Sequence, residues 1–288
     1  MTAPRANIFP DGRLHLQHGP IDLIITLTGT DEDVRTARRA AALRFRSILD
    51  ELMDEIDALK TPVRYHPKAD GLIANRMIEA VSWCGTSITP MAAVAGAVAD
   101  EVLDAITASA PLRRAIVNNG GDIAVHLEPG TEASVALCDL NGAAIGTVRI
   151  RAEDGIGGIA TSGRGGRSLA TGIADSVTVL AASGAEADAA ATALLGYVDL
   201  PGHPAVQRAP ASTLQPDSDL ADRLVVTAVG GLTEAEKRKA LQPGLDAAEV
   251  LAEIDIIREA AFILQGNTAH AGQSTRLAGT LTPPPSGD

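Results

Sequence analysis

The clearest pattern in the chain is an apolar stripe with helical spacing over residues 31–59. Its members recur at intervals of three and four residues, which places them on one face of an α-helix. They are Val34, Ala37, Ala41, Phe45, Ile48, Leu52, Ile56 and Leu59. Thr30 or Asp31 can cap the start of this helix, and Pro62 ends it.

Shorter apolar runs bounded by turn residues predict strands. They cover residues 14–17, 21–27, 114–117, 123–127, 134–139, 145–150, 176–182 and 224–228. Asn141-Gly142 predicts a hairpin turn between two of these strands. The segment from Asn118 to Asp122, with its Gly-Gly pair, predicts either a hairpin turn or a bulge that brings the backbone close to a ligand.

Further helices are expected at residues 89–106, 186–195 and 246–265. Small residues fill the first of them, so we expect it to pack tightly against a sheet or a ligand. Thr233 and Glu236 have the spacing of a capping box, and Gly266 is expected just past the end of the last helix.

The elements together predict an α+β fold, with a mixed sheet and packed helices, in one domain over residues 12–266. Residues 1–12 are expected to be loose, and residues 200–222, which contain four prolines, to form a long loop. The tail over residues 267–288 is polar and ends in a run of prolines, so we expect it to be disordered.

Composition narrows the class of protein. Aromatic residues make up only 2% of the 288 residues, so the core must consist of Ala, Val, Leu and Ile. A net charge of −12 argues against a nucleic-acid partner, because binding nucleic acid relies on neutralising phosphates.

The sequence shows neither a signal segment nor an apolar run long enough for a membrane span. We therefore expect a soluble cytoplasmic protein, and the sequence leaves its oligomeric state open. Cys84 and Cys138 allow a disulfide, but two free buried thiols are expected.

A glycine-dense run from Gly155 to Gly172 is the first candidate binding site. Free amides, the hydroxyls of Thr161, Ser162 and Ser168, and the guanidinium groups of Arg164 and Arg167 can surround phosphate oxygens. The alternative is an ordinary surface loop. The run contains G-x-G-x-x-A, but the glycines that follow would interrupt the helix that a dinucleotide fold needs there. Asp175, just beyond the run, can bind a ligand hydroxyl or cap a turn.

Asp188 and Thr192 form the second candidate site. Residues four apart on a helix share a face, and a carboxylate beside a hydroxyl suits a hard cation such as Mg²⁺. The alternative is that both residues are ordinary helix positions, since an acidic residue is expected in a first turn. The six histidines include no pair with metal-ligand spacing.

Three segments resemble motifs of the ApbE-type flavin transferases, in the order of that family. Residues 118–123 resemble its N-x-G-G-D-I motif, residues 159–163 its A-T-S-G segment, and residues 188–194 its D-A-x-A-T-A-L helix. The whole layout looks more like an uncharacterised cytoplasmic ApbE-like branch than like the transferases proper.

The resemblance implies FAD and Mg²⁺. FAD would be held across Asn118, Gly120, Gly121 and Asp122 and across Thr161, Ser162 and Gly163. The interpretation of the glycine-rich run as a phosphate site adds four further candidates for ligand binding: Arg164, Arg167, Ser168 and Asp175. Mg²⁺ would be held by Asp188, Thr192 and a backbone carbonyl near Val94. In the transferases, FMN passes to a threonine or serine of an acceptor protein, and no acceptor is identified here.

This chain departs from the family pattern in two places. The family's His-x-x-Asp-Pro-x-Thr-Gly segment is matched only by residues 167–172, which contain neither His nor Asp nor Pro. Its Lys-Gly-Tyr is matched by Ala95-Gly96-Ala97. Arginine cannot replace a general base, because it stays protonated. The catalytic residues therefore stay unknown, and three functions are compatible with the sequence: FAD cleavage or flavin transfer, flavin binding without turnover, and a partner-binding scaffold.

Overall fold

The computed structural model describes residues 3–85, 87–138, 144–166, 168–272 and 277. They form two compact units. Unit 1 comprises Met1–Ala133, Ile150–Ala160 and Ala181–Ala189, and unit 2 comprises Ser134–Arg149, Thr161–Leu180 and Ala190–Asp288. The chain passes back and forth between the units, so no single peptide bond separates them.

Unit 1 contains an antiparallel sheet in the order β1-β2-β3-β4-β5, which the start of β8 extends beyond β5. The strands are β1 (Arg5–Ile8), β2 (Leu14–His18), β3 (Ile21–Thr28), β4 (Arg114–Asn119), β5 (Asp122–Leu127) and β8 (Gly158–Ser162). Alternate residues of β2 and of the first part of β3 are buried, which is the pattern of strands with one face on a core.

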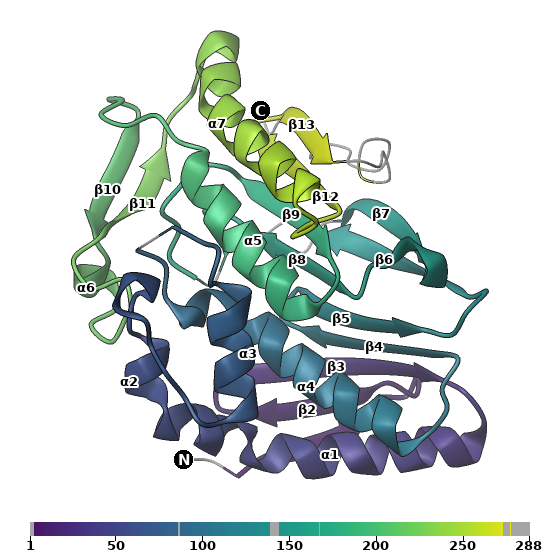
Figure 1. Ribbon diagram of the computed structural model, residues 1–288. Coiled ribbons are helices and arrows are strands. Elements are labelled where there is room, and N and C mark those ends of the chain that lie inside the picture. The colour runs from purple at the N-terminus through teal and green to yellow at the C-terminus, as the bar shows by residue number, and fades with distance from the viewer. Residues whose placement is uncertain (1–2, 86, 139–143, 167, 273–276, 278–288) are drawn as a thin grey trace. The chain divides into compact units, whose positions relative to one another are not determined.

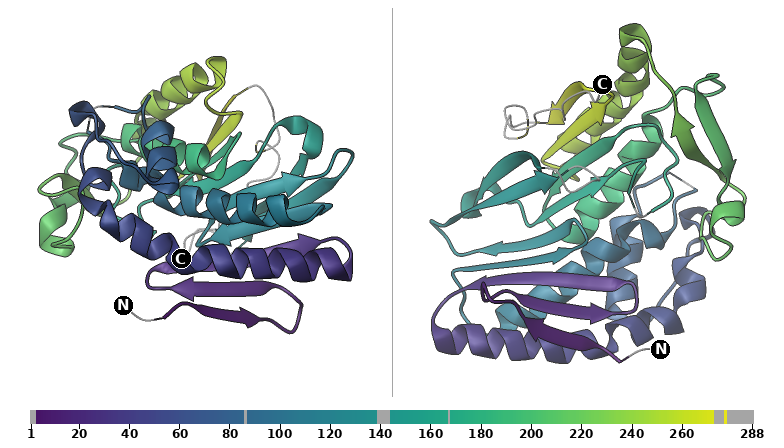
Figure 2. Two further views of the ribbon diagram at one scale, coloured as in Figure 1. Left: turned by 60° about the horizontal axis from the view of Figure 1, so that its bottom comes forward. Right: turned by 180° about the vertical axis from the view of Figure 1, so that it is seen from behind.

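The helices of unit 1 are α1 (Asp31–Asp54), α2 (Ile56–Leu59), α3 (Leu72–Ala80) and α4 (Val94–Ser109). Short 3-10 helices lie at Val63–Tyr65, Pro90–Ala93 and Ala152–Asp154. Helix α1 packs against α4, and α4 covers β4 and β5 (Figures 1 and 2). The predicted stripe of α1 is confirmed, since Ala37, Ala41, Phe45, Ile48 and Leu52 are buried. Thr30 caps this helix by accepting the Asp33 N–H.

Unit 2 contains a second antiparallel group of strands, in the order β9-β12-β13, packed against α7 (Figure 1). Its elements are β9 (Ser176–Ala181), α7 (Glu234–Glu253), β12 (Glu259–Leu264) and β13 (Asn267–Gly272). Two strand pairs are formed by β6 (Glu132–Cys138) with β7 (Ala144–Arg151) and by β10 (Val206–Pro210) with β11 (Leu224–Val229), and α6 (Ala211–Leu214) follows β10. Helix α5 (Gly184–Tyr197) continues from unit 1 into unit 2.

The α+β class and most elements are as predicted. The capping box at Thr233 and Glu236 is present at the start of α7. Cys84 is a free, buried thiol whose pKa burial raises to about 12. No helix in the part of the chain that the structure describes is long and apolar enough to cross a membrane. The predicted Asn141-Gly142 turn and the tail over residues 278–288 lie outside the described residues.

The helix predicted over residues 246–265 is wrong in its second half. Helix α7 ends at Glu253, and Asp255 has a φ of 62°, a left-handed conformation that ends the helix. The following run, Glu259–Leu264, is a strand whose six residues are all buried. A short, continuously apolar run has no periodicity that separates a buried strand from a helix.

Three segments predicted as irregular contain strands or helices. β1 lies within residues 1–12, and β10 and α6 lie within residues 200–222. The tail was predicted to begin at residue 267, but residues 267–272 form β13, which pairs with β12 along its whole length. β1 and β13 pair with the neighbouring strands β2 and β12, and β10 pairs with β11, and short polar segments carry no periodicity that shows such pairing.

The prediction of a single domain over residues 12–266 calls for a proteolysis experiment. Within residues 200–222, Arg208 pairs with Asp199, and the Ser212 amide donates to the Ala221 carbonyl. We therefore expect limited proteolysis to leave one resistant core without a cut in this segment. Mass spectrometry of the digest checks this, and two stable fragments divided between residues 200 and 222 would contradict it.

Candidate functional site

The Asn-Gly-Gly-Asp segment forms the two-residue turn of the β4–β5 hairpin, which decides between the two predicted possibilities. Asn119 pairs with Asp122 across the turn, and Gly120 and Gly121 have positive φ values of 66° and 117°. The Asn118 Oδ1 accepts the Gly121 N–H at 2.8 Å. Side chains with a Cβ rarely adopt such φ values, so the glycines serve the turn itself.

Asp188 lies in α5 with its carboxylate at the start of α4. Its Oδ2 accepts the Gly96 N–H at 3.0 Å. No side chain within α4 caps that helix, so Asp188 supplies an acceptor to one of its first amides. Asn119 approaches the same turn from β4, and its Nδ2 donates to the Ala95 carbonyl at 3.0 Å. The turn matched to the family's Lys-Gly-Tyr is thus held by two side chains of unit 1.

The buried Asp188 carboxylate lies close enough to Asp122 for the two charges to interact. Burial raises the pKa of Asp188 well above its usual value, and the nearby charge of Asp122 raises it further, against the opposing effect of the α4 amides. Asp188 is buried and Asp122 is half-buried, and the repulsion between their carboxylates is relieved either by a proton on Asp188 or by a bound cation. The donor set therefore fits a hard divalent ion.

The described residues contain no group of three or more His, Cys, Asp or Glu side chains arranged around a metal position. Thr192 lies one turn beyond Asp188 on α5 and is partly buried. Its hydroxyl is the type of oxygen ligand that a hard cation binds, and it lies on the helix face that the sequence predicts.

A second carboxylate makes the reciprocal contact. Asp100 lies in α4, and its two oxygens accept the N–H groups of Gly184 and Ala185, the first residues of α5, at 2.9 and 2.8 Å. Burial raises the pKa of Asp100 to about 6, although both amides and the positive charge of Arg76 oppose this shift. Each of the two helices thus caps the start of the other.

The two helix starts touch through glycines. A Cβ on Gly96 would lie 2.1 Å from the Gly184 carbonyl oxygen, far closer than any side chain tolerates. The small residues predicted to pack α4 tightly therefore bring it against the backbone of α5.

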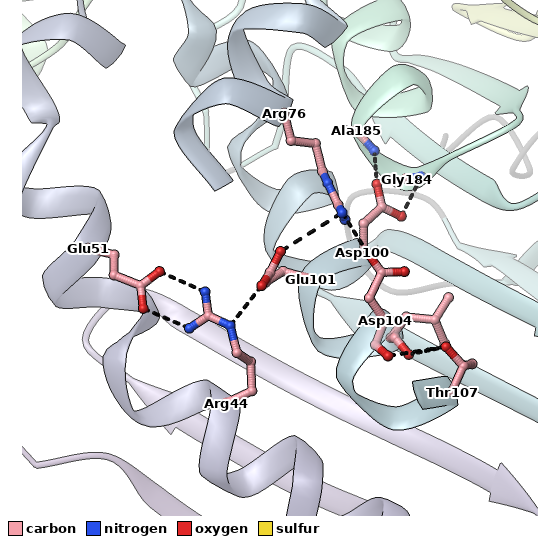
Figure 3. Close-up of polar contacts among 10 residues, drawn as sticks. Arg44, Glu51, Arg76, Asp100, Glu101, Asp104, Thr107, Gly184 and Ala185 are labelled. Carbon is pink, nitrogen blue, oxygen red and sulfur yellow. Dashed lines mark hydrogen bonds and ion pairs between the residues drawn. The ribbon is translucent and has the colours of Figure 1, made fainter. Parts of the chain in front are cut away.

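Acidic and basic side chains alternate along α4 beside Asp100 (Figure 3), and we call this group the charge ladder: Arg76, Asp104, Glu101, Arg44 and Glu51. Arg76 of α3 contacts Asp104 at 2.6 Å and Glu101 at 3.9 Å. Arg44 of α1 contacts Glu101 at 2.7 Å and holds both carboxylate oxygens of Glu51, at 2.8 and 2.7 Å. The ladder ties α4 to α1 and α3.

Unit 2 brings two residues of the glycine-rich prediction together. Arg164 contacts the Asp175 Oδ1 with Nε at 2.8 Å and Nη2 at 2.7 Å, and both side chains are about one-third exposed. The Asp175 Oδ2 accepts the Gln265 N–H at 2.5 Å. Asp175 therefore connects Arg164 to the end of β12, which gives it a structural role that the two predicted ones, ligand binding and turn capping, did not include.

Much of the glycine density has a structural cause. Added Cβ atoms at four of the glycines would lie within 2.2 Å of a carbonyl oxygen of the protein itself: Gly157 (Ala182), Gly158 (Ser183), Gly163 (Asp175) and Gly172 (Leu195). Thr161 exchanges a hydrogen bond with the buried Thr178 at 2.9 Å. Ser162 is partly buried, Ser168 is exposed, and Arg167 lies outside the described residues.

The predicted site residues thus form two groups. In unit 1 they are Asn118, Gly120, Gly121, Asp122 and Asp188, and in unit 2 they are Thr161, Ser162, Gly163, Arg164, Ser168, Asp175 and Thr192. Sequence reasoning missed Asp100 and Asn119. Asp100 had a recognisable signal, since it is the first carboxylate after the run of small apolar residues that begins α4, one turn after Gly96.

Comparison with known proteins places these features in a family. Residues 6–270 match the family model described as AbpE bacteria. A UPF0280 protein of Archaeoglobus fulgidus is 31% identical over 174 residues, which cover 60% of this chain and 70% of the relative. A UPF0280 protein of Methanopyrus kandleri is 36% identical over 57% of this chain and 65% of its own length. A third, from Methanobrevibacter smithii, is 35% identical over 46% of this chain, and the match spans only 54% of that relative.

Solved structures give more distant matches. The ApbE protein of Thermotoga maritima has a TM-score of 0.48 at 14% identity, with 94% of this chain and 97% of that one covered. The flavinyl transferase ApbE of Pseudomonas stutzeri has a TM-score of 0.38 at 13% identity, with 94% and 96% covered.

Proposed function

This chain belongs to the AbpE bacteria family, and from that premise we propose that it binds FAD together with Mg²⁺. The observation that carries the proposal is the buried Asp188 carboxylate beside Asp122, at the start of α4. The raised pKa of Asp188 means that its charge is relieved either by a proton or by a bound cation, and a cation there would provide a partner for an anionic ligand. An acidic protein with a net charge of −12 needs such a local positive centre to hold a dinucleotide.

In this proposal, Asp188 and Thr192 are the metal ligands, and Asp122 adds negative charge beside them. Bound Mg²⁺ would neutralise charge on the diphosphate of FAD. The chain's own contribution is orientation, because the Gly96 amide fixes one oxygen of Asp188 at 3.0 Å. The hairpin of Asn118, Gly120 and Gly121 presents exposed backbone to the flavin nucleotide.

The glycine-rich run of unit 2 is, by itself, a second candidate for phosphate binding. Ser168 and Arg164 are exposed, and we assign their polar groups, with Thr161, Ser162 and Arg167, to phosphate oxygens. Arg164 uses Nε and Nη2 on Asp175, so Nη1 is the nitrogen we assign to phosphate. The ion pair fixes the guanidinium in place before the ligand arrives.

Flavin transfer to an acceptor protein is the finer possibility. The residues at 167–172 supply no imidazole or carboxylate for general-base catalysis, which favours binding without transfer. Release of AMP from FAD in the presence of Mg²⁺ separates an enzyme from a binding protein. The cytoplasmic location and the acceptor stay predictions.

Removing the two arginines of the glycine-rich run is expected to weaken FAD binding. A charge-assisted hydrogen bond contributes about 1.5–3 kcal/mol, so each lost arginine lowers affinity by about ten- to a hundredfold. Titration of FAD, FMN and AMP with Mg²⁺ against Arg164→Ala and Arg164→Ala/Arg167→Ala measures the effect.

Arg258→Ala is the matched control for Arg164→Ala. Both arginines lie in unit 2, their side chains are both 33% exposed, and each pairs with one aspartate. Arg258→Ala is expected to leave FAD affinity unchanged. Equal affinities of Arg164→Ala, the double variant and the control for every ligand would exclude the arginines from the site.

A further inference from the structure

Asp100 makes a contact whose form differs from an ordinary helix cap. Both of its oxygens are engaged by the first two amides of α5, at 2.9 and 2.8 Å, and it lies on a different helix, 84 and 85 residues away in sequence. The first amides of a helix have no partners within the helix, so a bidentate acceptor there fixes both the position and the direction of its first turn. Asp188 lies one turn further along the same helix.

A second hydrogen bond links the same two helices in the opposite direction, from α4 to a side chain of α5. Asp188 accepts the Gly96 amide at 3.0 Å, and Gly96 lies one turn before Asp100 on α4. The close approach of Gly96 to the Gly184 carbonyl leaves no room for the two helix starts to move toward each other. Asp100 supplies two of the three hydrogen bonds that keep the helix starts from moving apart, so the place of the Asp188 carboxylate depends on it.

The charge ladder holds Asp100 from the other side. Arg76 lies near Asp100, Glu101 and Asp104, and Arg44 joins Glu101 to Glu51 (Figure 3). These contacts link α4 to α1 and α3. They therefore limit the movement of the helix that contains Asp100.

We propose that Asp100 is a positioning residue for the Asp188 site: by holding the first two amides of α5, it sets where the Asp188 carboxylate meets α4. Its importance for ligand binding rests on the function proposed above, but its effect on Asp188 exists without any ligand. The two consequences can be measured separately.

The experiment compares Asp100→Asn with Ser183→Ala. Asn keeps the size of Asp but offers one carbonyl oxygen, so one α5 amide faces an NH₂ group and loses its acceptor. Ser183 directly precedes the same helix and caps it locally, since its Oγ accepts the Glu186 N–H at 3.2 Å. Ser183→Ala therefore weakens the start of α5 without touching the link between the helices.

The ligand-free readout is hydrogen exchange of the Gly96 amide, whose acceptor is Asp188. Its protection is expected to fall by about tenfold or more in Asp100→Asn and to change little in Ser183→Ala. In the second readout, FAD affinity with Mg²⁺ falls by about tenfold or more in Asp100→Asn alone. If wild type binds no FAD, the proposed function fails and Gly96 exchange still decides the role of Asp100.

Unchanged Gly96 protection in a folded Asp100→Asn variant would overturn the proposal. An equal loss in Ser183→Ala would also overturn it, because the effect would then belong to the helix start in general. Asp100→Ser takes the place of Asp100→Asn if the amide variant does not fold, since it removes the buried charge as well as the bidentate acceptor.

Discussion

Asp188→Asn is expected to lower FAD affinity in the presence of Mg²⁺ by about a hundredfold or more while the protein stays folded. The amide has the shape of the carboxylate and keeps a carbonyl oxygen that can accept the Gly96 N–H. It removes the charge that a cation needs, together with the repulsion from Asp122. Titration calorimetry gives the affinity, and urea denaturation gives the free energy of unfolding.

Asp255→Asn serves as the control for this substitution. Asp255 is 78% exposed in its side chain, and its φ of 62° suits asparagine as well as aspartate. The same change of charge there is expected to leave FAD affinity unchanged. Wild-type affinity in Asp188→Asn would reduce Asp188 to a cap for α4.

Gly163→Ala is expected to destabilise the protein without any ligand present, by about 3 kcal/mol or more. The added methyl group would lie 2.1 Å from the Asp175 carbonyl oxygen and 3.2 Å from the Ser176 Cα. Both neighbours are backbone atoms at the start of β9, so relief of the clash requires the strand to move. Thermal or urea denaturation of the ligand-free protein measures the loss.

Gly231→Ala is the matched control, because an added Cβ there meets nothing within 4 Å. It is expected to leave the unfolding free energy within about 0.5 kcal/mol of wild type. If Gly163 served only to admit a ligand, Gly163→Ala would behave like this control in the absence of FAD and would differ only in binding.

The sequence predicted those elements whose signals are local. The stripe from Val34 to Leu59, the cap at Thr30 and the box at Thr233 each depend on residues within a few positions of one another. The cap and the box are present, and the stripe is present but the predicted single helix is divided at Glu55 into α1 and α2. The strand Glu259–Leu264 was missed because both of its neighbours in the sheet, β9 and β13, contribute to its burial. Nothing in six apolar residues shows how many neighbours they have.

The candidate site also contains features that the sequence shows and features that depend on the fold. Asp188 and Asp122 were found through their motifs, but the effect of Asp122 on the pKa of Asp188 depends on the fold bringing together residues 66 positions apart. The reciprocal caps of Asp100 and Asp188 also need the folded arrangement of α4 and α5. The glycine-rich run shows the opposite error, since residues chosen for a ligand also have to accommodate the protein's own carbonyl groups.

Calorimetric titration of FAD into the wild-type protein, with Mg²⁺ and then with EDTA in its place, tests the central claim most directly. The proposed site predicts saturable binding of one FAD per chain with Mg²⁺, and a loss of affinity of at least about a hundredfold when the metal is removed, because no cation then links the carboxylates to the diphosphate. Equal affinity with Mg²⁺ and with EDTA, or no binding under either condition, would contradict it.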